Sequence, residues 1–116
     1  GAVLDVGREY RTATPAQFAA LIARDGGCAF PGCTRPASWC IAHHISHWAD
    51  GGQTNLDNLV LLCTWHHTVV HHHGWQVRLG SDRLPDFYPP PWIDPDRAPR
   101  RNTRPRHQQT ISLPDT

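Results

Sequence analysis

The chain has 116 residues, of which 39% are hydrophobic, and its formal net charge is +1. This length suffices for one domain and excludes two of ordinary size, and the charge excludes a strongly basic molecule. Eleven prolines and nine glycines interrupt the apolar segments, so the predicted core is small and needs an additional source of stability. No apolar run approaches the roughly 18 residues of a membrane span, so we expect a cytoplasmic protein without membrane contact.

Residues 1–13 contain charges and turn formers without a clear period, and we interpret them as a lead-in. A helix is predicted next, because Thr14 is a suitable N-cap, Pro15 fits the first helical position and Gln17 completes a capping box. This helix is expected to cap the core. Its apolar stripe and the glycines that end it are Phe18, Leu21 and Ile22, then Gly26 and Gly27.

The segment from 28 to 75 is dense in Cys, His and Trp and contains several short elements. We predict a strand at 39–45, a turn-rich loop, a buried strand at 59–62, a helix at 64–73 and a strand at 75–79. From residue 81 onward, prolines forbid long regular elements. Residues 81–116 are therefore predicted to be an extended tail that either wraps the domain or is disordered. Its candidate anchors are Phe87, Tyr88 and Trp92.

The spacing of the cysteines predicts a structural metal site. Cys28 and Cys33 are separated by four residues that include a Pro-Gly turn, and Cys63 and His66 follow with the spacing C-x2-H. Together the two half-sites offer the four ligands of tetrahedral zinc, which can supply about 10–16 kcal/mol of folding free energy. The alternatives are buried free thiols or disulfides. Cys40 is interpreted as a core residue, and its alternative role is to replace His66 as a ligand.

Eight of the nine histidines lie between positions 43 and 73. His67 and His71 have the spacing H-x3-H on the predicted helix, which places both rings on one face. Such a pair can occupy two adjacent positions of one ion. A third ligand from the first strand would leave open positions for water and a phosphate oxygen, as a catalytic metal requires. The sequence therefore predicts a second metal centre.

The segment from 28 to 75 resembles HNH endonucleases, whose ββα-metal core arranges two strands and a helix around one ion. It is particularly similar to actinobacterial HNH domains that follow a larger helical domain of unknown function. The resemblance implies an α+β fold, with a small ββα-metal core, a structural zinc clip, an N-terminal capping helix and an extended Pro-rich tail. The shared motifs are Ala42-His43-His44-Ile45, Gly51-Gly52, Asn55-Leu56-Asp57-Asn58-Leu59 and Leu62-Cys63-Thr64-Trp65-His66-His67, then Arg24-Asp25-Gly26-Gly27-Cys28, Phe30-Pro31-Gly32-Cys33 and Gly74-Trp75.

The resemblance also implies roles for individual residues. His44 corresponds to the general base, and Asn58 corresponds to the residue that ties the loop and orients His44. His43 and His67 correspond to ligands of a catalytic divalent cation, and His71 resembles an additional ligand of relatives that end in H-x3-H. Adjacent residues of a regular strand point to opposite faces, so His43 and His44 can share a site only where the strand end is twisted or broken.

The implied function is metal-dependent hydrolysis of DNA phosphodiester bonds. Neutral His44 would remove a proton from the attacking water, while the cation stabilises charge on the phosphorane and the leaving 3′ oxygen. Mg²⁺, Mn²⁺, Ni²⁺ and Zn²⁺ are the candidate cations, and a histidine-rich site favours the softer ions over magnesium. Double-stranded DNA would be bound mainly through its backbone. The candidate contacts, against the alternative of a solvated basic tail, are Arg100, Arg101 and Arg104.

Two other functions are compatible with the sequence. One is a non-catalytic zinc module that binds nucleic acid or a partner protein. Such a module needs the cysteine pairs but has no need of His43, His44, Asn58 and His67 together. The other is a transferase or toxin domain on the same scaffold. An upstream domain of the full-length protein is a candidate partner. The predicted organisation is a lead-in at 1–13, the nuclease domain at 14–80 with its motif core at 28–75, and the tail at 81–116.

Overall fold

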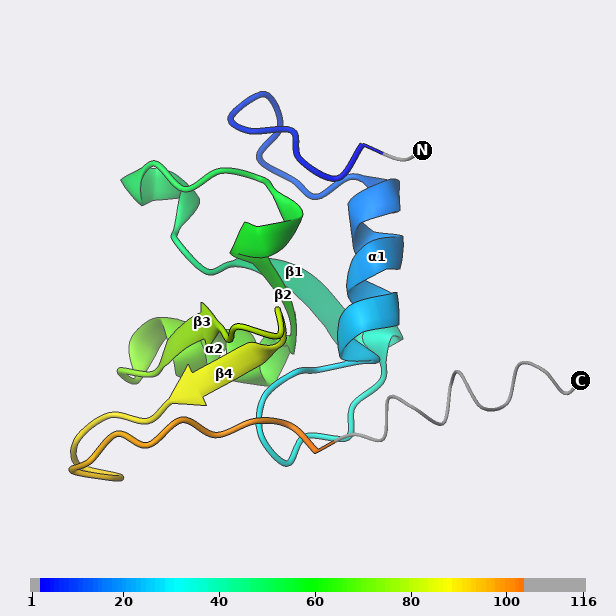
Figure 1. The fold of residues 1–116 in the computed structure, drawn as a ribbon. Helices are drawn as coiled ribbons and strands as arrows, with labels where there is room; N and C mark the ends of the chain where they lie inside the picture. Colours follow the sequence, from blue (N-terminus) through cyan, green and yellow to red (C-terminus); the bar gives the residue numbers. More distant parts are fainter. Residues whose placement is uncertain (1–2, 104–116) are drawn as a thin grey trace, which may run out of the picture.

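Two helices and two small antiparallel sheets make up the regular structure of residues 3–103, the part of the chain that the computed structural model describes (Figure 1). The α+β class predicted from the sequence is confirmed. The helices are α1 (Pro15–Asp25) and α2 (Thr64–His72). The strand pairs are β1 (Cys40–His44) with β2 (Leu59–Cys63), and β3 (Gln76–Leu79) with β4 (Pro85–Tyr88). The short 3-10 helices are η1 (Ala37–Trp39), η2 (Trp48–Asp50) and η3 (Leu56–Asn58).

Helix α1 begins where its capping residues predict. The Gln17 amide donates to Thr14 Oγ1 at 3.1 Å and the Thr14 amide donates to Gln17 Oε1 at 3.0 Å, which closes the capping box. The helix ends at Gly26, whose φ of 77° is left-handed. Its fully buried face differs from the predicted apolar stripe, because it consists of Gln17, Leu21 and Asp25.

The two polar residues of this face are buried because distant backbone groups supply their partners. Gln17 Nε2 donates to the carbonyls of Leu4 (2.8 Å) and Thr54 (2.9 Å). Asp25 Oδ2 accepts from the Leu61 amide in the middle of β2 at 3.0 Å. Buried polar groups are stable only with such partners. Helix α1 is therefore fixed to the lead-in, the loop before β2 and β2 itself by specific hydrogen bonds.

We expect Asp25→Ala to lower the free energy of unfolding by about 3 kcal/mol, because the Leu61 amide would lose its acceptor and Arg24 its buried ion-pair partner. Urea unfolding measures the change. Asp57→Ala is the matched control, since Asp57 is 55% exposed and pairs with the exposed Arg83. Its expected cost is below about 1 kcal/mol. Equal losses in the two variants would contradict a specific role for the buried carboxylate.

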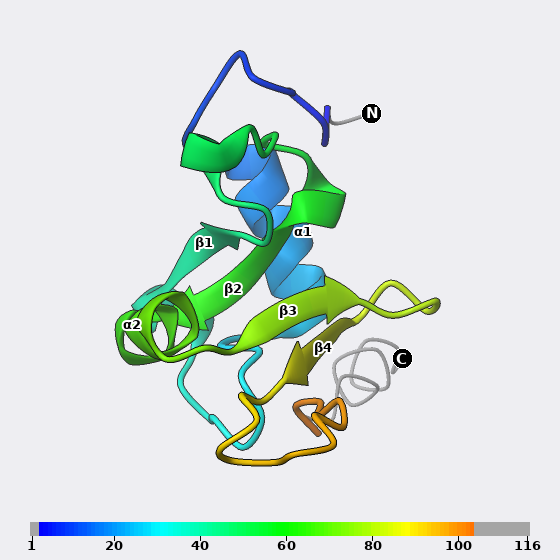
Figure 2. The same cartoon turned by 90° about the vertical axis from the view of Figure 1, so that its left-hand side faces the viewer.

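The ribbon formed by β1 and β2 is the centre of the molecule, with α1 on one side and α2 on the other (Figure 2). All five residues of β2 are buried. The register pairs Cys40 with Cys63, so these two cysteines lie at one end of the ribbon and the histidines of β1 lie toward the other. Helix α2 starts directly after Cys63 and packs back against both strands, which brings His67 beside His43.

The hairpin of β3 and β4 spans the end of the predicted domain at residue 80. Strand β4 was not expected, because proline lacks an amide hydrogen and is confined to strand ends and edges. Pro85 occupies such a position as the first residue of β4. Phe87 is fully buried and exchanges two backbone hydrogen bonds of 2.8 Å with Arg100, so the chain after β4 lies along the hairpin edge. Trp92, expected as an anchor, is instead 75% exposed.

Asn102 fastens this returning segment to the loop that contains the first two cysteines. Its side chain is buried, and its Nδ2 donates to the carbonyls of Cys28 (3.2 Å), Phe30 (2.7 Å) and Cys33 (2.9 Å). These contacts join residues about 70 positions apart in the sequence, so no local sequence pattern predicts them. Neither helix within residues 3–103 combines the length and the apolar character needed to cross a membrane.

Candidate active site and metal centre

Three thiols and one imidazole meet at the cysteine end of the β1–β2 ribbon. Their ligand atoms, from Cys28, Cys33, Cys63 and His66, all lie within 4.8 Å of one another. His66 Nδ1 is 3.3 Å from Cys63 Sγ and 3.5 Å from Cys28 Sγ, and nitrogen and sulfur ligands of one tetrahedral zinc ion are about 3.6 Å apart. The cluster is therefore compatible with zinc. Cys40 lies outside it, and its thiol donates to the Pro36 carbonyl at 3.3 Å.

A tight turn and an aromatic stack shape this Cys3His cluster. The Cys33 amide donates to the Phe30 carbonyl at 3.0 Å, and Gly32 has the φ of 81° that the turn requires. The Phe30 ring stacks on the His66 imidazole with centroids 4.1 Å apart and planes 6° from parallel. The aromatic residue between the first two cysteines thus fixes the plane of the nitrogen ligand.

Hydrogen-bond donors around Cys63 favour its thiolate. Burial alone would raise the pKa of Cys63, but hydrogen bonds from the His66 amide, from Cys28 and from the Arg35 guanidinium at 3.5 Å lower it below the ordinary value. Burial raises the pKa of Cys28. Thiolates are the form that binds metal, so a cation in the cluster would complete the deprotonation of its ligands.

A second cluster consists of histidines from β1 and α2. His43 Nδ1 and His67 Nδ1 lie 2.9 Å apart, within hydrogen-bond distance. Two nitrogen ligands of one tetrahedral zinc ion are about 3.4 Å apart, so a small shift of the rings would let both bind one cation. His43 is 4% exposed, and burial, followed by the neighbouring imidazoles, lowers its pKa to about 3. Burial also lowers the pKa of His67. Both rings are therefore neutral at neutral pH, which is the form that binds a cation.

Two further histidines border the His43–His67 pair. The His71 ring is parallel to the His67 ring with centroids 5.9 Å apart, and the His47 ring lies 4.8 Å from His71 and 5.6 Å from His43. Within residues 3–103, the Cys3His cluster is the only group that gathers three or more ligand atoms within 4.8 Å. His71 is therefore a neighbour of the pair and not part of an equally tight set.

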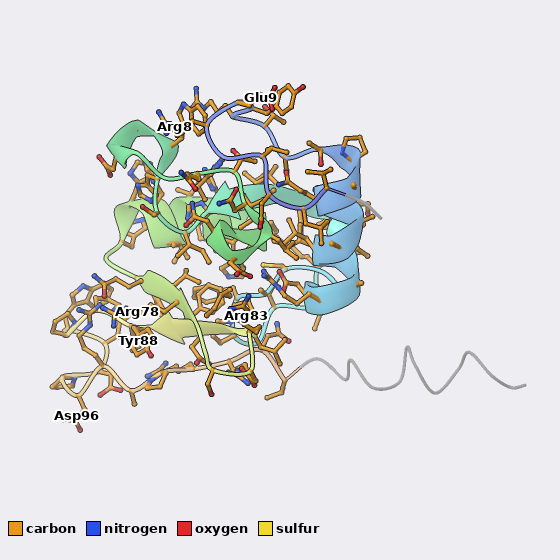
Figure 3. All side chains as sticks on the ribbon, turned by 45° about the horizontal axis from the view of Figure 1, so that its top comes forward. Arg8, Glu9, Arg78, Arg83, Tyr88 and Asp96 are labelled. Carbon is orange, nitrogen blue, oxygen red and sulfur yellow. The ribbon has the colours of Figure 1, made fainter. Side chains whose placement is uncertain are left out.

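The histidines predicted to be catalytic line one cavity of about 660 Å³, which is open to solvent. His43, His44 and His67 all border it. His43 and His44 both pair with β2, opposite Val60 and Leu59, yet both border this cavity, so their adjacent positions in the strand do not place them in separate sites. A second cavity, of about 480 Å³, shares His43 and is bordered by Arg78 of β3, whose guanidinium lies 5.4 Å from the Tyr88 ring (Figure 3).

His44 is held by a hydrogen bond that the sequence does not suggest. His44 Nε2 lies 2.9 Å from Thr54 Oγ1, and the Thr54 hydroxyl donates to the Arg11 carbonyl at 3.1 Å. Burial is the largest cause that lowers the pKa of His44, and Arg11, His47 and Arg8 lower it further. The ring is therefore neutral at neutral pH and can accept a proton.

Asn58 fastens the loop between β1 and β2. Its Oδ1 accepts from the Ser46 amide at 2.8 Å, and its Nδ2 donates to two loop carbonyls at 2.8 and 3.0 Å. The loop also needs Gly52, because a Cβ there would lie 1.8 Å from the Ser46 carbonyl oxygen. The ring of His44 is hydrogen-bonded to Thr54 and not to Asn58, so any influence of Asn58 on His44 passes through the loop.

The lead-in brings two arginines to this loop and to the cavity. Arg8 donates to the carbonyls of Trp48 (2.7 Å) and Gly52 (2.9 Å), and its guanidinium lies 3.7 Å from the centroid of the Trp48 ring (Figure 3). Arg11 borders the cavity together with His44. The sequence gives no signal for these two positions, because the lead-in has no periodic pattern that would predict its contact with this loop.

The tail arginines have other surroundings. Arg101 pairs with Asp82 at 2.5 Å and Asp86 at 2.9 Å, and these hydrogen bonds raise its pKa above the ordinary arginine value. Arg100 is exposed and pairs through its backbone with β4. Neither of them borders the histidine cavity. Arg104, the third tail arginine singled out from the sequence, lies outside the described residues.

Comparison with known proteins agrees with this arrangement. A family model described as HNH endonuclease matches residues 28–73, which contain the Cys3His cluster and the histidines of the cavity. Two uncharacterized proteins of Mycobacterium tuberculosis are 36% identical over 103 residues (89% of this chain, 22% of the relative) and 33% identical over 107 residues (87% and 23%). An uncharacterized protein of Mycobacterium bovis is 36% identical over 84 residues (72% and 18%).

The chain thus spans about a fifth of the length of these relatives. No solved structure matches it. The matched segment begins at the first cysteine, runs through the β1–β2 ribbon and ends with helix α2, so the sequence match and the strand–strand–helix arrangement cover the same residues. Residues 28–73 of this chain belong to the HNH endonuclease family.

Proposed function

We propose that this domain hydrolyses DNA phosphodiester bonds with a histidine base and one divalent cation. The supporting observation is the meeting of His43, His44 and His67 at one open cavity, with the Nδ1 atoms of His43 and His67 2.9 Å apart. A module that only bound a partner through its Cys3His cluster would need none of these three side chains. The family of residues 28–73 supports the same reaction class.

In the proposed reaction, His44 is the general base. Its neutral ring accepts a proton from water while the water oxygen attacks phosphorus and the bond to the leaving 3′ oxygen breaks. His43 and His67 would hold the cation, with His71 as a neighbouring candidate ligand. A cation bound there would stabilise the negative charge of the phosphate in the transition state. Asn58 stabilises the loop between β1 and β2, part of which borders the cavity.

Duplex DNA is the proposed substrate, and contacts to its backbone are the proposed source of affinity. Arg11 lies at the cavity and presents the planar guanidinium that suits a phosphate group. Arg100, Arg101 and Arg104 remain proposed backbone contacts, although Arg101 already has two carboxylate partners. Because the chain spans about a fifth of its relatives, an upstream domain of a longer protein is a further proposed source of affinity.

The donor atoms suggest which cations serve the reaction. Imidazole nitrogen suits zinc and nickel, whereas magnesium prefers oxygen ligands and retains much of its water. We therefore expect Ni²⁺ and Zn²⁺ to support cleavage at lower concentrations than Mn²⁺ and Mg²⁺.

A supercoiled-plasmid assay tests the proposal. Protein that retains zinc in its Cys3His cluster is freed of weakly bound ions by a mild chelator, and the four cations are added in turn. Cutting should require an added ion, and His67→Ala should slow it by at least about 100-fold, because a catalytic cation contributes several kcal/mol of charge stabilisation. His73→Ala is the matched control, since His73 is exposed at the end of α2 and borders neither cavity.

Two results would contradict the proposal. A plasmid that is retarded in a gel but remains intact with every cation would identify a non-catalytic binding module. Equal cutting by His67→Ala and the wild type would remove the His43–His67 pair from the reaction.

A further inference from the structure

Thr54 is fully buried in the loop between β1 and β2, beside the histidine cavity. Its backbone is fixed on both sides. Its amide donates to the Gly7 carbonyl at 2.8 Å, and its carbonyl accepts from the Val6 amide at 3.0 Å and from Gln17 Nε2 at 2.9 Å. The hydroxyl group of Thr54 therefore has a defined position set by the lead-in and by α1.

The partners of this hydroxyl determine where its hydrogen points. A threonine hydroxyl has one hydrogen to donate and two lone pairs that accept. The Arg11 carbonyl, 3.1 Å away, can only accept, so the hydroxyl hydrogen is directed to it. Thr54 Oγ1 must then accept from its other neighbour, His44 Nε2 at 2.9 Å. A neutral imidazole has one N–H group, so the hydrogen on Nε2 leaves His44 Nδ1 with a free lone pair.

We propose that Thr54 is a positioning residue for the general base: together with the Arg11 carbonyl, it holds His44 in the tautomer protonated on Nε2, so that Nδ1 receives the proton of the attacking water. This inference rests on the proposed nuclease function and adds to it the atom that acts as base. The last acceptor of the chain of hydrogen bonds lies in the lead-in, outside the matched segment 28–73.

The proton transfer balances with these atoms. One O–H bond of water breaks and its proton forms a bond to His44 Nδ1, while the water oxygen forms a new bond to phosphorus. The bond between phosphorus and the 3′ oxygen breaks, and that oxygen takes a proton from solvent. The imidazolium keeps its Nε2–H bond to Thr54 Oγ1, and it returns to the neutral form when Nδ1 releases its proton to solvent.

The variants Thr54→Val and Thr54→Ser distinguish the contribution of the hydroxyl group from that of the side-chain volume. Valine keeps the volume but cannot accept from His44, and serine keeps the hydroxyl. We expect Thr54→Val to lower kcat for plasmid cleavage at least about tenfold with KM within about twofold, because ring orientation affects the chemical step more than binding. Thr54→Ser should stay within about threefold of the wild type. Cleavage by Thr54→Val at the wild-type rate would overturn the proposal.

The tautomer of His44 can also be measured without any cleavage. Long-range ¹H–¹⁵N spectra of the zinc-loaded, ¹⁵N-labelled wild type identify the protonated ring nitrogen, and the His44 signals are assigned by their loss in His44→Ala. We expect the hydrogen on Nε2; a hydrogen on Nδ1 would refute the inference even if Thr54→Val failed to fold. If the hydrogen is on Nε2 and the wild type never cuts DNA, the proposed nuclease function is wrong, but the hydrogen bonds from His44 through Thr54 to the Arg11 carbonyl are still supported.

Discussion

Plasmid cleavage by His44→Ala is expected to be about 10²- to 10⁴-fold slower than cleavage by the wild type, which is the usual contribution of a positioned general base. The loss should appear in kcat, because His44 acts on the water and not on the affinity for DNA. Removal of the ring also removes one hydrogen bond to Thr54, a cost of about 1 kcal/mol that leaves the fold intact. Zinc content and circular dichroism should therefore match the wild type.

The cavity offers a sharper test of the same assignment. Its volume of about 660 Å³ and its open mouth should admit free imidazole beside Arg11 and His67. Added imidazole should restore part of the cleavage by His44→Ala, because its neutral nitrogen can accept the proton that His44 would accept. Full activity of His44→Ala in the absence of imidazole would exclude this residue from the mechanism.

Loss of the Cys3His cluster should have the largest effect on stability. Structural zinc contributes about 10–16 kcal/mol in small zinc-dependent folds, whereas whole domains are stable by about 5–15 kcal/mol. Cys63→Ser is therefore expected to abolish cooperative thermal unfolding and to lower the bound zinc well below one ion per chain. Cys63 is both a ligand in the cluster and the N-cap of α2, where its sulfur accepts from the His66 amide at 3.5 Å.

Cys40→Ser is the matched control for this variant. Cys40 is also buried and lies directly opposite Cys63 in the ribbon, but its thiol lies outside the cluster and donates a hydrogen bond to the Pro36 carbonyl. Its replacement should leave one zinc ion per chain and a cooperative transition. Retention of zinc by Cys63→Ser, or its loss from Cys40→Ser, would mean that the ligand set is different from the one described.

Local chemistry made much of the fold predictable. The capping box of Thr14 and Gln17 placed the start of α1, and the short apolar run before Cys63 marked β2. These features depend on residues within one or two turns of each other, so their physical causes can be read along the chain. The two cysteine half-sites were predictable in the same way, because each has ligand spacing on its own.

The features that sequence reasoning missed depend on contacts between distant residues. The buried face of α1 contains Gln17 and Asp25 because carbonyls and amides from elsewhere satisfy them, and a hydrophobic period cannot reveal such partners. Strand β4 exists because Phe87 pairs with both β3 and Arg100. The Thr54 hydroxyl meets a carbonyl 43 positions earlier, and no motif specifies that meeting.

Asn102 shows that the folding unit is longer than the family motif. A fragment that stopped after β4 would retain every ligand and every histidine of the cavity, yet the three carbonyls around the first cysteine pair would lose a shared amide donor. Exposed carbonyls in that turn would be free to rearrange, and the thiols attached to the same backbone would move with them. We therefore expect a stably folded fragment to extend at least to Asn102, well past His71, the last residue that borders the histidine cavity.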